Sequence, residues 1–239
     1  MLLDGNALHE AALRALPLAG LHHLAIFTVA AIIWARRESA RTVLSAYMSG
    51  AFATAAAVLL WSSGTRPYGL LAIALAVVWL RETTNPRGEL AFRRTPRPRL
   101  ALMAAAAALA LCYPGYSGGL PPFIFSPVGV TLQPTVILSL ALLNASEGPT
   151  NRTLHWILAI VGAALGVAGA ARGEWLDVSL LLLSGHAGLL LIRGGRLLPD
   201  EGQETAGSVE DIRRRMYARR SFLPGPRDPR RRPRASRRR

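Results

Sequence analysis

Four polar side chains in apolar stretches are the strongest candidates for a binding site in this sequence. Gln133, Thr135 and Ser139 stand within seven residues of one stretch, and His186 stands in the middle of a second. Polar groups in such surroundings are costly, so they mark function by default. They predict a small pocket or pathway lined by Gln133, Thr135, Ser139 and His186. A pathway would also draw on the hydroxyls of Ser45, Ser49, Thr54 and Ser184.

Residues for catalysis, metal binding or electron transfer are sparse. No Asp or Glu lies well inside an apolar stretch, which argues against a pump that uses buried carboxylates. A haem between two histidines would pair His186 with His22, but His186 would lie about 12 Å below its helix end, from a rise of ~1.5 Å per residue, and His22 is shallower. Cys112 is the single cysteine, which excludes an internal disulfide and a multi-cysteine metal site. We therefore predict no catalytic residue, no metal and no cofactor, with haem as the weaker alternative.

Long windows without charge alternate with short charged connectors. The longest window runs from Leu100 to Ser146, and only 18% of all residues are charged, against about a quarter in soluble domains. About 20 apolar residues in a helix span a bilayer core of about 30 Å. The windows predict an all-α integral membrane protein with a bundle of about seven transmembrane helices. The predicted spans lie near residues 18–35, 43–61, 67–80, 100–114, 131–144, 154–171 and 177–193.

Arginine sets the predicted orientation. All 28 basic residues are Arg, and together with much Ala, Gly and Pro this indicates a GC-rich bacterial genome. The connectors after the first, third and fifth predicted spans hold ten arginines, whereas those after the second, fourth and sixth hold only Arg66 and Arg172. Cytoplasmic loops of membrane proteins are enriched in Arg and Lys. We therefore predict a multi-pass protein of the bacterial cytoplasmic (inner) membrane, with its N-terminus outside and its C-terminus inside.

The chain ends in a basic tail. Residues 213–239 hold 13 Arg and one Asp, and so account for most of the formal net charge of +14. We expect residues 1–17 to form an outer-face leader, 18–193 the transmembrane domain, and 194–239 a largely disordered cytoplasmic tail with a short amphipathic helix near 208–222. A basic amphipathic helix beside a membrane binds anionic lipid headgroups, whereas nucleic acid is the weaker alternative because neither a pattern of interleaved aromatic residues nor a known nucleic-acid-binding module is evident. The predicted lipid-facing residues are Arg213, Arg214, Arg215, Arg219 and Arg220.

Two further segments carry open alternatives. The uncharged, Pro- and Gly-rich loop at 115–130 is either an interfacial cap or a lid over a pocket, because irregular backbone cannot face hydrocarbon. Gly162 and Gly166 stand four apart in the predicted sixth span, and small residues at this spacing let helices approach closely. That glycine face serves either packing inside the bundle or a homodimer.

Several stretches resemble a family of uncharacterised bacterial integral-membrane proteins. They read RGELAFRRTPRPR, VGVTLQPTVILSLALL and VGAALGVAGAARGEWLDVSLLLLSG, within about residues 44–190. The family pattern has a cysteine where this chain has Gln133. The resemblance implies a polytopic membrane fold and transfers no activity.

Two function classes remain open at this point. The first is a non-catalytic accessory, scaffold or sensor component that packs against other membrane proteins. The second is a small transporter or channel with a pocket closed by the 115–130 loop. A membrane enzyme is a third, less favoured class, because the sequence shows no paired carboxylates, nucleophile motif or metal-ligand spacing.

Overall fold

The computed structural model describes most of the predicted transmembrane domain. The described residues are 10, 13–35, 40–61, 63–85, 95–113, 127–146 and 151–192, all within one compact unit that spans residues Met1–Leu198. The basic tail with its five named arginines, the helix expected near 208–222 and most of the 115–130 loop lie outside the described residues.

The described residues are all-helical, and each of the seven predicted segments is an α-helix, which confirms the all-α prediction. The observed bounds lie within four residues of the predicted ones. The short 3-10 turns η2 (Ser63–Thr65) and η4 (Trp175–Asp177) precede two of the helices. The helices are α2 (Leu16–Ala35), α3 (Ala40–Trp61), α4 (Arg66–Thr84), α5 (Arg97–Leu111), α6 (Leu132–Ala145), α7 (Arg152–Ala171) and α8 (Val178–Ile192).

Local sequence signals account for several helix ends. Helices α4 and α5 each carry a proline in their first two positions, where the missing N–H costs nothing because no helical partner exists for it. Asn151 caps α7: its Oδ1 accepts a hydrogen bond from the backbone N–H of Leu154 at 3.2 Å. After α7 the chain turns at Gly173, whose φ of +79° is a conformation that favours glycine.

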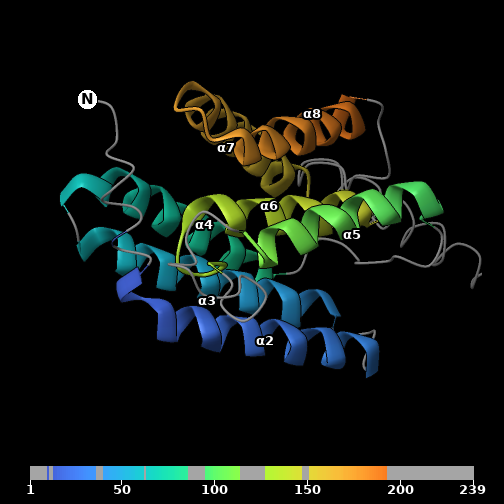
Figure 1. The fold of residues 1–239 in the computed structure, drawn as a ribbon. Helices are drawn as coiled ribbons and strands as arrows, with labels where there is room; N and C mark the ends of the chain where they lie inside the picture. The colour runs from blue at the N-terminus through green and yellow to red at the C-terminus, as the bar shows by residue number, and fades with distance from the viewer. Residues whose placement is uncertain are drawn as a thin grey trace, which may run out of the picture. The chain divides into compact units, whose positions relative to one another are not determined.

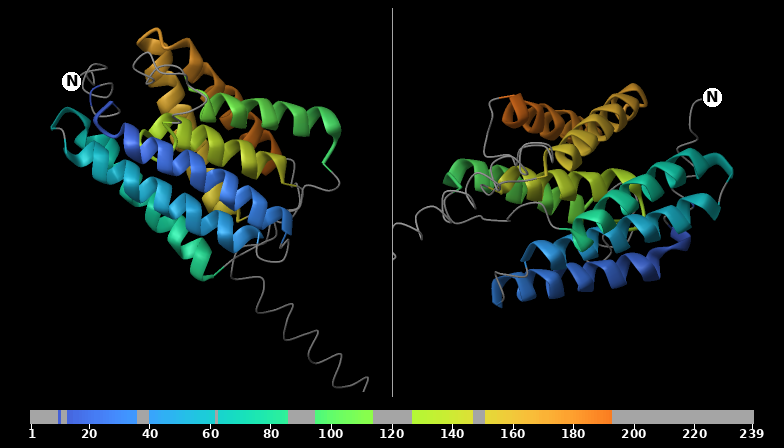
Figure 2. Two further views of the ribbon diagram at one scale, coloured as in Figure 1. Left: turned by 60° about the horizontal axis from the view of Figure 1, so that its bottom comes forward. Right: turned by 180° about the vertical axis from the view of Figure 1, so that it is seen from behind.

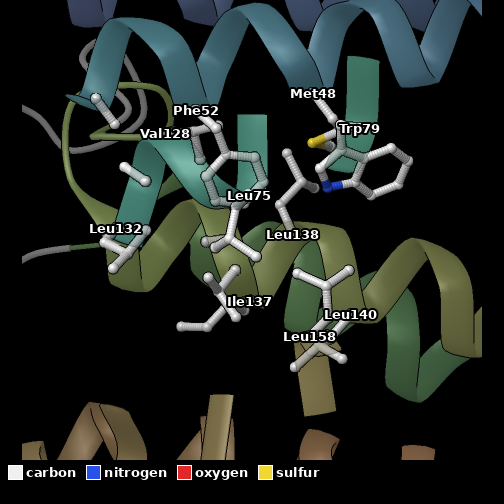
Figure 3. Packing of buried hydrophobic residues seen from close by; sticks show 14 of the residues in the cluster. Met48, Phe52, Leu75, Trp79, Val128, Leu132, Ile137, Leu138, Leu140 and Leu158 are labelled. Atoms are coloured by element: carbon white, nitrogen blue, oxygen red, sulfur yellow. The ribbon is translucent and has the colours of Figure 1, made fainter. Parts of the chain in front are cut away.

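Helix α6 is the centre of the bundle. It packs against α3, α5, α7 and α8, and it lies between the α3–α4 pair and the α7–α8 pair in Figure 1 and in both views of Figure 2. Every residue of α6 except Leu142 is buried. Figure 3 shows large side chains from neighbouring helices gathered around it: Met48 and Phe52 from α3, Leu75 and Trp79 from α4, and Leu158 from α7.

The outer faces of the bundle are apolar. On α4 the exposed large side chains recur every three or four residues, so they line one face of the helix. Helix α8 repeats the pattern with Val178, Leu182, Leu189 and Ile192. Three segments are long and apolar enough to cross a membrane, namely Ala40–Trp61, Arg152–Ala171 and Trp175–Ile192, and two shorter ones, Pro17–Ile33 and Leu132–Ala145, are apolar as well. The stripe on α4 consists of Leu70, Ile73, Val77 and Leu80.

Candidate functional site

Two of the predicted pocket residues, Thr135 and Ser139, use their hydroxyls on backbone groups. The Thr135 hydroxyl donates to the carbonyl of Thr131 at 2.6 Å and accepts from the N–H of Gly129 at 2.9 Å. One turn further on, the Ser139 hydroxyl donates to the carbonyl of Thr135 at 2.9 Å and lies 3.4 Å from the sulfur of Met48. Both side chains are buried. Their hydrogen bonds fix the start of α6 and its contact with α3.

Gln133 differs from these two residues. Its side chain is 1% exposed, and neither its amide nitrogen nor its amide oxygen has a hydrogen-bond partner among the described residues. A buried polar group without a partner carries its full desolvation cost, about 1–3 kcal/mol. Of the predicted pocket residues on α6, Gln133 is the one with hydrogen-bonding capacity left for a ligand or for another segment.

His186 lies in a different neighbourhood from the pocket residues of α6. It interacts electrostatically with Arg99 and His155. His155 is in turn 2.8 Å from the side-chain oxygen of Asn144 through its Nε2. The Nε2 atom of His186 itself has no hydrogen-bond partner among the described residues. These neighbours place His186 near the C-terminal end of α6, whereas Gln133 and Thr135 lie in its first turn.

The two histidines considered for haem have different surroundings. The His22 ring lies edge-on to Tyr47, with centroids 6.0 Å apart. It also covers Gly129, where an added Cβ would be 2.5 Å from the ring and where φ is +79°. His22 thus fills the space that a glycine leaves at the turn before α6. In the part of the chain that the structure describes, no group of three or more His, Cys, Asp or Glu residues could hold a metal ion.

The glycine face of α7 packs inside the bundle. An added Cβ at Gly162 would be 2.5 Å from the Ser184 hydroxyl of α8, and one at Gly166 would be 2.8 Å from the Leu181 side chain. Of the two alternatives for this face, the structure shows packing within the chain. A homodimer through Gly162 and Gly166 would have to displace α8.

A buried ion pair joins α3, α4 and the start of α7. Arg41 contacts the Oε1 atom of Glu82 through Nη2 at 2.5 Å and Nε at 2.6 Å, with the two side chains 7% and 1% exposed. The other carboxylate oxygen of Glu82 accepts from the amide of Asn151 at 2.7 Å. We call these three residues the Arg41 cluster. Both oxygens of its carboxylate have a donor.

Arginine also closes the C-terminal end of α6. Arg99 donates through Nε to the carbonyl of Asn144 at 2.7 Å and through Nη2 to that of Ser146 at 3.1 Å. Thr95 donates to the carbonyl of Ala145 at 2.7 Å. The last carbonyls of a helix have no partner within it and form its negative end, so a guanidinium there is favourable.

A second group of buried polar residues lies where α7 passes into α8. Asp177 is fully buried, and its Oδ1 accepts from the hydroxyl of Tyr113 at 2.5 Å. Arg172 binds Glu174 with two hydrogen bonds, of 2.9 and 3.0 Å, and a third, of 3.4 Å, runs to the hydroxyl of Tyr68. Arg172 Nη2 is 3.8 Å from Oδ2 of Asp177. We call these five residues the Asp177 cluster.

Gly169 makes the position of Asp177 possible. An added Cβ at Gly169 would be 2.0 Å from Oδ2 of Asp177, so the carboxyl group lies directly against the bare backbone of α7. Beside it, the hydrogen bonds from Arg172 hold the pKa of Glu174 below its usual range. The cluster therefore combines one guanidinium with two carboxyl groups. The guanidinium forms hydrogen bonds to Glu174, and it makes only a longer contact of 3.8 Å with Asp177.

Sequence reasoning gave these carboxyl groups no role. Glu82 and Asp177 lie at helix ends, where a charge normally reaches water, so both count as part of the charged connectors. The stretch RGEWLD did hold a signal, because Arg172, Glu174 and Asp177 follow one another within six residues in a short connector. The buried partner of Asp177, Tyr113, is 64 positions away and could not be identified without the fold.

No family model, curated protein or solved structure matches this chain. The resemblance to a family of bacterial membrane proteins therefore stays a prediction.

Proposed function

We propose that this chain is a multi-pass membrane protein of the bacterial inner membrane that acts as a non-catalytic scaffold, accessory or sensor component. The observation that carries the proposal is that four of the six expected pathway hydroxyls donate to backbone carbonyls. The other two, those of Ser45 and Ser184, are buried and have no hydrogen-bond partner among the described residues. Ser49 donates to the carbonyl of Ala76 on α4 at 3.0 Å, and Thr54 donates within its own helix to Gly50 at 2.9 Å. Thr135 and Ser139 likewise bind backbone carbonyls, so these side chains form separate contacts instead of a polar track.

The apolar outer faces support insertion into lipid. Stripes of exposed Leu, Ile and Val on α4 and α8 would be unfavourable in water over such an area, whereas a bilayer solvates them. Trp61 and Trp175 are 86% and 74% exposed at connectors of the same predicted side. Tryptophan is enriched where the bilayer meets water. These side chains fit an aromatic belt at the outer interface.

Contacts between connectors support the predicted alternation. The Arg41 cluster joins residues beside the first, third and fifth connectors. The Asp177 cluster joins residues beside the second, fourth and sixth connectors. Odd connectors thus meet odd ones and even meet even ones, as they must when successive helices run up and down. With arginine concentrated in the odd connectors, this favours seven crossings with the N-terminus outside and the tail in the cytosol.

Single-cysteine labelling tests this topology. In a Cys112→Ser background, Ser63→Cys is predicted to react with a membrane-impermeant maleimide in intact spheroplasts, because it follows α3 on the outer side. Ser208→Cys in the tail is predicted to react only after permeabilisation. Labelling of both positions from the same side would contradict an odd number of crossings.

Small water-soluble thiol reagents test the scaffold assignment without a known substrate. Ser139→Cys and Ser45→Cys, made in the same background, replace buried serines of α6 and α3 by a similar side chain. In a dry bundle they stay unmodified in the folded protein and react after denaturation. Trp175→Cys, at a position whose side chain is 74% exposed, is the reactive control. Modification of both buried cysteines at the rate of the control would reveal a wetted path and overturn the scaffold proposal.

One observation favours the alternative of a transporter or channel. The buried amide of Gln133 has no hydrogen-bond partner among the described residues, and it lies directly after the 115–130 loop that was predicted to close a pocket. Gln133→Cys distinguishes the two functions. Reaction of this cysteine together with Ser139→Cys indicates a pathway, whereas protection of both supports the scaffold.

A further inference from the structure

The Asp177 cluster has an imbalance of charge: among the described residues, Arg172 is the one cation that pairs with its two carboxyl groups. If both carboxyl groups were ionised, one guanidinium would face two negative charges. Asp177 would then hold its charge fully buried at the junction of α7 and α8. An uncompensated buried charge is among the most costly features a fold can contain, and proteins commonly avoid it by keeping such a group neutral.

The two oxygens of Asp177 have different partners. Oδ1 accepts the hydrogen bond from Tyr113. Oδ2 lies against the backbone at Gly169 and has no hydrogen-bond donor among the described residues. The side chain of Glu174 is within hydrogen-bonding reach of the Asp177 carboxyl group. Two carboxyl groups within hydrogen-bonding reach repel each other when both are ionised. They attract each other when one carries a proton and donates a hydrogen bond to the other.

The partners of Glu174 show which of the two carboxyl groups carries the proton. Arg172 bonds both oxygens of Glu174, and a two-fold contact of this kind requires a carboxylate. Glu174 is also the more exposed of the two, at 34% against 0% for the Asp177 side chain. The negative charge is therefore stabilised on Glu174, beside the guanidinium and solvent, and the proton belongs on Asp177.

We propose that Asp177 is a proton-binding site of the folded chain. Its carboxyl group keeps a proton at neutral pH, donates a hydrogen bond to the carboxylate of Glu174 through that proton, and accepts a hydrogen bond from the hydroxyl of Tyr113. The site takes up one proton from water on folding and releases that proton to water when it ionises. The cluster then contains one positive and one negative charge. The site involves only groups within the described bundle, so it exists whatever partner the protein serves.

Ionisation of Asp177 would weaken the junction of three helices. It turns the hydrogen bond to Glu174 into repulsion at the point where α7 ends and α8 begins, and Tyr113 connects the same carboxyl group to the end of α5. The titratable and charged groups that face it are Tyr113, Tyr68, Arg172 and Glu174. Among these, only Arg172 could pair with the new charge, and its hydrogen bonds already go to Glu174 and Tyr68.

Infrared difference spectroscopy of the full chain in lipid, between low and high pH, tests the proposal directly. The wild type should show the C=O stretch of a protonated carboxylic acid at neutral pH, which disappears as the pH is raised. Asp177→Asn should lack this band, because the isosteric amide replaces the acid. Glu174→Gln should also lack it at neutral pH, because Arg172 is then free to bind an ionised Asp177. A band that is unchanged in Asp177→Asn would overturn the assignment, and one that persists in Glu174→Gln would overturn proton sharing.

Thermal unfolding gives an independent measurement. The unfolded chain releases a proton that the folded chain keeps, because free Asp ionises near its ordinary pKa of about 3.9, so stability falls as the pH rises above this value towards the titration point of the folded site. In that range the wild type should lose roughly 2–5 °C in Tm per pH unit relative to Asp177→Asn. Asp177→Asn keeps a donor for Glu174 and an acceptor for Tyr113, so it should fold. Identical pH profiles of the two proteins would contradict the proposal.

Discussion

The Arg41 cluster and the Asp177 cluster both bury carboxyl groups at helix ends, but they differ in charge balance. In the first, one guanidinium meets one carboxylate, and both oxygens of Glu82 have donors. In the second, one guanidinium meets two carboxyl groups, and among the described residues Oδ2 of Asp177 has no donor. A balanced cluster joins helices through charges that compensate each other. An unbalanced cluster needs a proton to remove the excess negative charge. The stability of the Asp177 cluster is therefore expected to depend on pH, although it consists of the same kinds of charged residues as the Arg41 cluster.

Removal of one partner from the balanced cluster is expected to have the largest effect. Glu82→Leu leaves Arg41 buried without Glu82 and should lower the free energy of unfolding by about 3–5 kcal/mol. Thermal unfolding in detergent, followed by tryptophan fluorescence, measures the change.

The double variant Arg41→Leu/Glu82→Leu is the matched control. It removes both charges and should recover most of the loss, because two apolar side chains replace a buried ion pair at little cost. If the double variant is less stable than Glu82→Leu alone, the pair has a role other than mutual charge compensation.

Crowding of the unbalanced cluster comes second. Gly169→Ala places a methyl group on Oδ2 of Asp177 and should cost about 1–3 kcal/mol, the usual range for overpacking. Gly185→Ala on α8 is the control, since an added Cβ there meets nothing within 4 Å, and it should be neutral or stabilising by up to about 1 kcal/mol. Equal stability of the two variants would show that Asp177 does not rest against α7.

Loss of the Tyr113 hydroxyl measures the charge on Asp177. Tyr113→Phe should cost about 1 kcal/mol if the hydroxyl donates to a neutral acid, against about 1.5–3 kcal/mol if it donates to a carboxylate. A loss in the upper range, measured by denaturant unfolding near neutral pH, would show that Asp177 is ionised and would remove the difference between the two clusters.

The smallest effect is expected where a charge pair is exposed. Glu10 and Arg14 lie 3.6 Å apart one turn from each other, with side chains 69% and 74% exposed. Glu10→Gln should change the unfolding free energy by less than about 0.5 kcal/mol. If Glu10→Gln lowered the unfolding free energy as much as Glu82→Leu, burial would not be what determines how much a charge pair contributes to stability.

Helix positions could be predicted from the sequence because charge is excluded from apolar windows. The windows ended at Arg36, Arg66 and Arg81, and the observed helices end or begin close to these residues. The structure adds prolines in the first turns of α4 and α5, a local signal that the sequence reasoning did not use. The arrangement of the helices in space, with α6 at the centre, could not be predicted, because the sequence gives no distances between segments.

The candidate site was much harder to predict than the helices. Thr135 and Ser139 were chosen for their polarity, but a hydroxyl in a helix readily bonds to the carbonyl four residues earlier, and both do so here. The position of Asp177 depends on the hydrogen bond from Tyr113 and on the space that Gly169 leaves. Nothing in the sequence around Tyr113 or Gly169 indicates that either residue contacts a carboxyl group. The value of a polar residue is set by its partners, and these come from distant positions.

The burial of α6 also decides which helices must fit the thickness of a bilayer. With 14 residues and a rise of ~1.5 Å each, α6 is about 21 Å long, shorter than an average hydrocarbon layer. Because α6 packs against four other helices and nearly all of its residues are buried, its shortness would cause no hydrophobic mismatch in the proposed membrane topology. In that topology the longer helices of the bundle, α2, α3 and α7 with 20, 22 and 20 residues, would determine the bilayer thickness that fits with least deformation.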